Sequence, residues 1–198
     1  MCSWDSAFYA DQSNYCWAHI KSGKLFPDER KQVGGPLPKT FIESRAEMEK
    51  LLVEERVGYL GLVFDNRPYV IPLTYGYSEG KLIFHCAVKG SKLDIIRTNP
   101  DACFTVSRHF GEMVSHPQGA ECHINSDSVI CYGKARIIEN IEERCQVLNT
   151  FNRCLQPNAR EITIEEVENC NAVEIIINKM TGRSERDGKC TYWKHIVT

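Results

Sequence analysis

The stretch at residues 82–100, LIFHCAVKGSKLDIIRTNP, contains the residues best suited to bind an anion. Apolar residues recur at helical spacing after Gly90, which places Ser91 at or near a helix N-terminus. Unpaired backbone N–H groups and the helix dipole favour an anion there, and Lys89 and Lys92 add full positive charges. Gly90 lets the backbone approach a phosphate closely. The stretch predicts an oxyanion site for the phosphate of a cofactor, with Lys92 as its best single cationic ligand.

The same residues also suit an ordinary strand-to-helix turn with solvated lysines. G-S-K lacks the full phosphate-loop pattern G-x-x-x-x-G-K-[ST], and the acidic residue of a dinucleotide fold is not evident on a following strand. Spacing alone favours the ordinary turn over the oxyanion site. His85 is either a core histidine with satisfied hydrogen bonds or a proton donor that faces a ligand, and its place beside the turn favours the second. The neighbouring Cys86 suits a buried, small apolar side chain.

A second group of chemically capable residues, His109, His116, Cys122 and His123, follows in one short stretch, with Cys103 and Cys131 on the flanking strands. Zinc accepts such ligands, but structural sites usually pair ligands roughly two to four residues apart, and no C-x-x-C occurs here. The sequence therefore favours no metal site and leaves zinc as an alternative. A cysteine–histidine hydrolase is less favoured still, because ten cysteines and six histidines make chance pairings easy.

Composition excludes several classes of protein. A chain of 198 residues is long enough for one sizeable core. A net charge of −2 without a long basic run argues against nucleic acid as a partner. No apolar stretch approaches the roughly 18 residues that cross a bilayer, so no membrane partner is expected. The start resembles no secretory signal, so the ten cysteines are expected to be free thiols in the cytoplasm.

The elements that must position these residues are mostly short strands. We expect strands over 57–64, 69–77, 82–84, 102–108, 127–139 and 172–180, and helices over 45–55, from Ser91, over 141–155 and over 164–169. The first three strands should form a meander, and residues 109–123 a loop. Pro72 places its strand at an edge or a bulge, and Gly133 indicates a bulge or a close backbone approach.

This succession of elements favours an antiparallel β-barrel with flanking helices over a parallel α/β sheet. Residues 1–40 are expected to form an N-terminal extension and linker, because the segment closes with GGPLP. Residues 41–183 are expected to form the barrel domain, and residues 184–198 a C-terminal tail.

Three segments, RPYVIPLTYGY at 67–77, FHCAVKGSKLDIIRTNP at 84–100 and SDSVICYGKARII at 126–138, resemble a known family. They are similar to the flavin-binding split-barrel superfamily related to pyridoxamine 5′-phosphate oxidase, and most to its branch of nitroimidazole-resistance reductases. The resemblance covers Ser44 to Arg183 in the same order. It implies a mainly β fold, a six-stranded antiparallel split β-barrel with peripheral helices, and a homodimer that binds FMN at the subunit interface.

The resemblance also implies which residues hold FMN. Backbone contacts to the isoalloxazine ring are expected from Val70, Ile71, Pro72 and Leu73. The phosphate turn corresponds to His85, Ala87, Lys89, Gly90, Ser91 and Lys92. Ser126, Ser128 and Val129 would approach the flavin from the partner subunit. His85 matches the histidine that faces the flavin and substrate in the nitroimidazole branch.

The function that the resemblance implies is an FMN-dependent oxidoreductase. It would take electrons from NAD(P)H and reduce a small acceptor, such as a nitro-heterocycle of the 5-nitroimidazole type. His85 is the expected proton donor, since an imidazole titrates near neutral pH. A flavin- or haem-binding sensor or carrier without rapid turnover is the alternative. Ser91, where the oxidase has a basic residue, and a tail without several arginines argue against oxidation of pyridoxamine phosphate.

Overall fold

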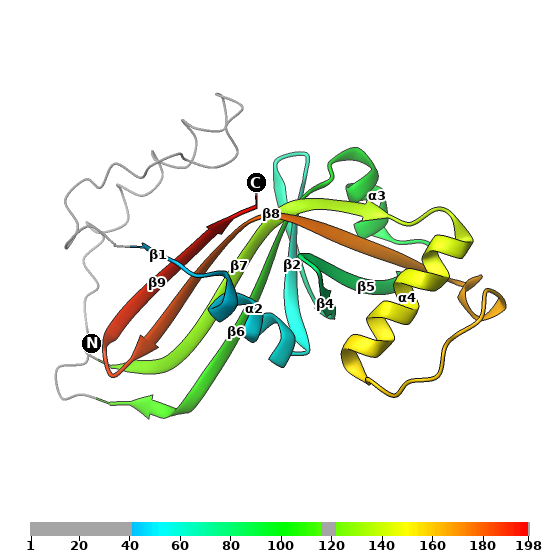
Figure 1. Cartoon of the computed structure of the whole chain (residues 1–198). Coiled ribbons are helices and arrows are strands. Elements are labelled where there is room, and N and C mark those ends of the chain that lie inside the picture. The colour runs from blue at the N-terminus through cyan, green and yellow to red at the C-terminus, as the bar shows by residue number, and fades with distance from the viewer. Residues whose placement is uncertain (1–40, 116–121, 198) are drawn as a thin grey trace. The chain divides into compact units, whose positions relative to one another are not determined.

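A computed structural model describes residues 41–115 and 122–197 (Figure 1). The predicted N-terminal extension, residues 1–40, lies outside the described residues, as does His116. The helices are α2 (Arg45–Glu54), α3 (Ser91–Thr98), α4 (Ile141–Leu155) and the 3₁₀-helix η3 (Glu165–Val167). The strands are β1 (Phe41–Glu43), β2 (Val57–Phe64), β3 (Arg67–Thr74), β4 (Gly76–Ser78), β5 (Lys81–Ala87), β6 (Asp101–Val114), β7 (His123–Ile137), β8 (Cys170–Arg186) and β9 (Lys189–Ile196).

All these strands belong to one sheet whose main path runs β1-β9-β8-β7-β6-β2-β3. The pairing is antiparallel except between β1 and β9. The first half of β8 also pairs with β5, and β5 pairs with β4, so the sheet bends around its own core. This antiparallel, mainly β architecture with flanking helices confirms the predicted fold class.

The main core lies inside the bend, between the sheet and helices α2 and α3. Leu60, Phe84 and Phe104 from three strands are fully buried there, together with Met48 of α2 and Leu93 of α3. Burying each such side chain contributes roughly 1.5–3 kcal/mol. The helices therefore cover the inner face of the sheet, and its outer face carries neither of them.

The predicted meander of the first three strands is wrong. Tyr75 divides the second run into β3, which pairs with β2, and β4, which pairs with β5. The side chain of Tyr75 is 1% exposed, and its hydroxyl donates to the carbonyl oxygen of Leu52 at 2.9 Å. Its ring meets that of Phe104 edge-on, with centroids 5.0 Å apart. This anchor bends the chain into the core, so the strand cannot continue straight along β2.

Several strands are longer or more numerous than the sequence predicted. β6 continues to Val114 and β7 begins at His123, so strands replace most of the described part of the predicted loop at 109–123. β8 continues to Arg186, and β9 occupies most of the segment predicted as a tail. With β1, β9 and the division at Tyr75, the described residues form nine strands instead of six. The polar ends of these strands hide the alternation that identifies a strand.

Two predictions about special backbone positions are confirmed. Pro72 lies in β3, the edge strand of the main path. The register between β7 and β8 shifts between Tyr132 and Gly133. A Cβ atom at Gly133 would lie 2.1 Å from the carbonyl oxygen of Ile176, so the two backbones approach too closely for any other residue.

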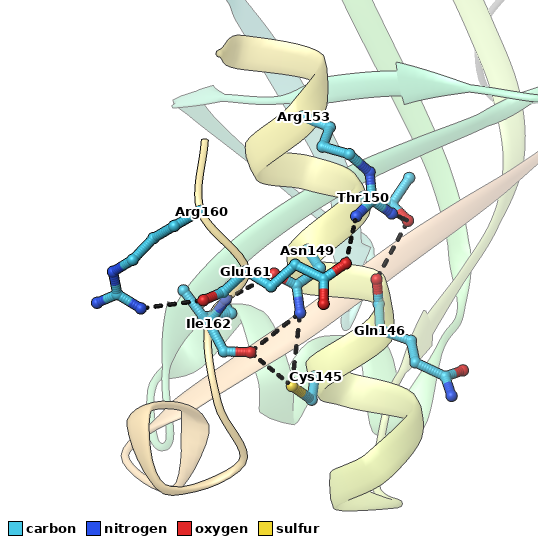
Figure 2. A network of polar contacts seen from close by, with 8 residues as sticks. All are labelled: Cys145, Gln146, Asn149, Thr150, Arg153, Arg160, Glu161 and Ile162. Atoms are coloured by element: carbon cyan, nitrogen blue, oxygen red, sulfur yellow. Dashed lines mark hydrogen bonds and ion pairs between the residues drawn. The ribbon is translucent and has the colours of Figure 1, made fainter. Parts of the chain in front are cut away.

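The side chain of Asn149 on α4 forms hydrogen bonds to the backbone of the segment that follows this helix (Figure 2). Asn149 is 9% exposed, its amide nitrogen donates to the carbonyl oxygen of Ile162 at 3.1 Å, and its amide oxygen accepts from the N–H of Ile162 at 2.8 Å. The thiol of Cys145 donates to the same carbonyl oxygen at 3.2 Å. These contacts satisfy backbone groups that no sheet reaches.

Candidate functional site

The predicted turn leads into the N-terminus of helix α3, and the backbone there is accessible to a ligand. α3 begins at Ser91, and the N–H groups of Leu93 and Asp94 donate to the carbonyl oxygen of Gly90 at 2.9 and 3.4 Å. The N–H groups of Ser91 and Lys92 precede these first bonds. Gly90 has a φ of 148°, a conformation that favours glycine, and a Cβ atom there would meet nothing within 4 Å. A bound group can therefore reach the backbone at this point.

The turn is also electropositive. Lys89 is exposed and Lys92 half-buried, and neither forms an ion pair with any residue that the structure describes. The one acidic residue of the first helical turn, Asp94, is paired with Arg97, with Oδ1 and Nη1 3.3 Å apart. Burial raises the pKa of the Cys86 thiol, and the charge of Lys92 opposes that rise. The ammonium group of Lys92 therefore lies close enough to the end of β5 to affect the Cys86 thiol electrostatically.

His85 lies at the same end of β5, on the face that α4 covers. Its neighbours on that face, Ile83 and Ala172, belong to the smaller core cluster under α4. The imidazole ring meets the ring of Phe151 edge-on, with centroids 5.3 Å apart. His85 is exposed, and none of the described residues forms a hydrogen bond or ion pair with its ring. It is therefore not a core histidine with satisfied hydrogen bonds.

Strands β3 and β5 diverge beside this turn. β4 and β5 pair through Gly76 and Ile83, and the same register continued would place Thr74 opposite His85 and Pro72 opposite Ala87. In the described ranges, however, β3 pairs only with β2, and β5 beyond Ile83 pairs only with β8. Backbone groups on the edge of β3 are thus available to a ligand. The predicted backbone contacts to the isoalloxazine ring need such an unpaired edge.

The four predicted residues of β3 divide between its two faces. Val70 and Pro72 are exposed on the outer face of the sheet. Ile71 and Leu73 are half-buried against the main core. Successive residues of a strand turn their backbone N–H and C=O groups to its two edges alternately, so only every second residue of this segment presents them at the free edge, and Pro72 has no N–H to donate.

The third predicted group does not meet the turn within one chain. Ser126 and Ser128 are half-buried on β7, opposite His109 and Ser107 of β6. β7 meets the chain that follows α3 at Ala135, whose N–H donates to the carbonyl oxygen of Pro100 at 2.7 Å. Seven residues of strand separate Ala135 from Ser128, which is about 23 Å. The approach of these serines to a flavin bound by a second copy of the chain stays a prediction.

Val129 does not share a face with those two serines. It is 1% exposed on the inner face and lines a cavity of about 350 Å³ beneath α2. Leu51 and Trp193 line the same cavity, far from the outer face. Successive side chains of a strand point to opposite faces, so the sequence alone was enough to predict that Val129 and Ser128 lie on different faces.

Two further predictions concern metals and membranes. In the described ranges, no group of three or more histidine, cysteine, aspartate or glutamate side chains is arranged to hold a metal ion. His116, one member of the predicted cluster, lies outside those ranges. No helix between residues 41 and 115 or between 122 and 197 is long and apolar enough to cross a membrane.

Polar residues that the motifs did not indicate also shape this region. Asn171, 6% exposed at the start of β8, donates from its amide to the carbonyl oxygen of Val88 at 3.3 Å, within the turn. Glu174, on the same strand, is 3% exposed beneath α4. Their only sequence signal is a polar residue inside the apolar run CNAVEIII.

Comparison with known proteins shows the family to which this sequence belongs. The family model for pyridoxamine 5′-phosphate oxidase matches residues 44–184. A curated relative, an uncharacterised protein of Rhizobium meliloti, is 30% identical over 77 residues, which are 39% of this chain and 48% of that protein. This match thus spans about half the length of the relative.

Solved structures share the fold. A candidate 5-nitroimidazole antibiotic resistance protein from Bacteroides thetaiotaomicron is 25% identical, with a TM-score of 0.62 over 72% of this chain and 85% of that one. An FAD- and haem-binding protein from Mycobacterium smegmatis is 18% identical, with a TM-score of 0.62 over 79% of this chain and 76% of that one. The family match covers well over half of the sequence, and this chain belongs to the pyridoxamine 5′-phosphate oxidase family.

Proposed function

We propose that this chain is a flavoprotein that binds FMN with its phosphate on the turn Gly90–Lys92. The observation that carries the proposal is the pair of lysines, Lys89 and Lys92, that no described carboxylate neutralises beside an open helix N-terminus. Such a terminus binds phosphate through its N–H groups and dipole. Family membership and the FAD-binding relative on the same fold support the proposal that this phosphate belongs to a flavin nucleotide.

The chain's own residues fit the rest of the cofactor. The N–H groups of Ser91 and Lys92 would bind phosphate oxygens, and the ammonium group of Lys92 would add a charge-assisted bond. The free edge of β3 at Val70–Leu73 would hydrogen-bond the edge of the ring. FMN, when bound, supplies two-electron redox chemistry, while the protein supplies orientation and hydrogen bonds.

A homodimer would complete the site. The outer sheet face, which we define by Val57, Tyr59, Val63 and Val70, is uncovered by any described helix, and Tyr59 is 49% and Val70 63% exposed. Monomeric proteins rarely leave such a contiguous apolar surface in water. A second copy docked on this face would bury it and would bring Ser126 and Ser128 to the partner's flavin.

The activity that we propose is reduction of a small acceptor with electrons from NAD(P)H. The Bacteroides relative supports a nitro-heterocycle as the acceptor class. His85 would hold the proton that the reduced acceptor takes up, because its ring is exposed beside the turn and pairs with no described residue. Phe151 would limit the rotation of that ring by packing on its edge.

Stopped-flow mixing of the FMN-loaded protein with NADH or NADPH, followed by a 5-nitroimidazole, tests this activity. A reductase bleaches the visible absorbance of the flavin within about a second and recovers it when the acceptor is added, since enzymes typically turn over at about 1–10³ s⁻¹. Flavin that stays oxidised for minutes with both nucleotides would reject the reductase and favour the carrier, for which the FAD- and haem-binding relative is a precedent on this fold.

A further inference from the structure

We infer that Asn171 is a positioning residue for the phosphate turn, which it serves by orienting the peptide between Val88 and Lys89. The inference rests on the proposed binding of FMN at this turn. Asn171 belongs to β8, and its amide nitrogen donates to the carbonyl oxygen of Val88 at 3.3 Å. Val88 is one of the three residues that connect β5 to α3.

The burial of Asn171 indicates that this residue does more than fill space in the core. The residue is 6% exposed, and a buried amide costs free energy unless it is hydrogen-bonded. Its neighbours in sequence, Ala172 and Val173, are fully buried and apolar. An apolar residue would therefore fill the position at less cost if packing alone mattered.

The bond fixes the direction of an N–H group. All described peptide bonds are trans, so the carbonyl of Val88 and the N–H of Lys89 point in opposite directions. The carbonyl points inward to a buried side chain, so the N–H of Lys89 points away from the core. The side chain of Val88 is 42% exposed, which agrees with a backbone turned in this way.

An outward N–H at Lys89 adds a donor next to those of Ser91 and Lys92. The same bond keeps the carbonyl oxygen of Val88 away from a bound phosphate, which it would otherwise repel. Asn171 thus acts on the phosphate through Val88 and touches no part of it. Loss of the bond should weaken binding of the phosphate group and leave binding of the ring unchanged.

Affinities for FMN and riboflavin separate these effects, because riboflavin lacks only the phosphate. The test variant is Asn171→Leu, which keeps the branched shape of the side chain and removes the donor. Asn149→Leu is the matched control, since Asn149 is also buried and also bonds a backbone carbonyl, but at Ile162. We expect Asn171→Leu to reduce the preference of the protein for FMN over riboflavin about tenfold, and Asn149→Leu to leave that preference unchanged.

The outcomes distinguish this inference from the proposed function. A wild-type protein that binds FMN no more tightly than riboflavin would refute the phosphate turn itself, and the inference with it. A wild-type preference that Asn171→Leu retains, or that both variants reduce equally, would overturn only the role of Asn171. The amide resonance of Lys89 in the wild-type protein gives a second measurement if Asn171→Leu does not fold. It should shift when FMN is added and not with riboflavin, and no difference between the two would overturn the inference.

Discussion

Glu174 accepts a hydrogen bond from Arg136, with Oε2 and Nη2 2.5 Å apart, although Glu174 is only 3% exposed. Its other carboxylate oxygen lies 3.4 Å from the ammonium nitrogen of Lys81 on β5. Arg136 also reaches Glu143 of α4, at 2.8 Å. One buried carboxylate thus joins β5, β7 and β8, and through Arg136 it fixes α4, whose Phe151 packs against His85.

Replacing this carboxylate should destabilise the fold. We expect Glu174→Gln to lower the free energy of unfolding by about 1–2 kcal/mol, because charge-assisted bonds are lost while the partly exposed cations stay hydrated. Urea denaturation measures the change. Glu161→Gln is the control, since Glu161 also pairs with an arginine, at 3.5 Å, but is 81% exposed. Equal losses in the two variants would show that the burial of Glu174 does not matter.

The charge of Lys92 should serve the phosphate. We expect Lys92→Met to weaken FMN binding by about 10- to 100-fold and to leave riboflavin binding unchanged, as for a bond to a charged group. Fluorescence titration gives both affinities. The control is Arg97→Met, at the other end of α3 and already paired with Asp94. A Lys92→Met protein with wild-type affinity for FMN would place the phosphate elsewhere.

His85 should act on the acceptor rather than on the cofactor. His85→Gln is expected to lower the rate of acceptor reduction about 100-fold, a typical loss for a general acid, while FMN stays bound at the wild-type ratio. Steady-state rates across pH, with flavin content measured in parallel, test this. His195→Gln, at a histidine of β9 whose Nδ1 lies 3.5 Å from a carboxylate oxygen of Glu43, should keep the wild-type rate. Unchanged turnover in His85→Gln would exclude the role.

The outer sheet face should hold two copies together. Tyr59→Glu places a charge in the middle of this face, and we expect it to convert a dimer into a monomer, because a buried unpaired charge opposes association. Sedimentation velocity measures the mass. Ile164→Glu, at an apolar residue of similar exposure beside η3, should remain dimeric. The proposed interface is refuted if both variants sediment like the wild type.

Asp127 should make stability depend on pH in the acid range. Burial raises the pKa of its carboxyl group, but hydrogen bonds from Arg186 and Ser184 and the charge of Arg108 outweigh burial and lower the pKa below its ordinary value of 3.8. A lowered pKa stabilises the folded state above the unfolded pKa, and this stability is lost as the pH falls through the folded value. The wild type should therefore exceed Asp127→Asn in unfolding free energy at neutral pH. The difference should shrink below about pH 4, and a constant difference down to pH 2 would contradict this.

Local patterns in the sequence predict the elements that local forces decide. Helix α4 follows from its apolar spacing, and the bulge at Gly133 and the edge position of Pro72 follow from the chemistry of single residues. The turn at Gly90 with its two lysines belongs to this class, so the start of α3 after Gly90 was predictable. What it binds stays a prediction.

Contacts between distant residues were not predictable in this way. The bend at Tyr75 depends on a bond to Leu52, and the orientation of Val88 depends on Asn171, 83 positions further along the chain. Neither pair has a sequence signal beyond a polar atom in an apolar setting. The separation of Val129 from Ser128 is different, because alternation along the strand already contained it.

The visible absorption spectrum of the purified protein, followed by identification of the molecule that heat releases, tests the central claim most directly. Binding of FMN on the turn Gly90–Lys92 predicts two flavin bands, and release of FMN at about one per chain, with neither FAD nor riboflavin in its place. A colourless protein that takes up no added FMN would contradict the claim and would leave the cationic turn without its proposed ligand.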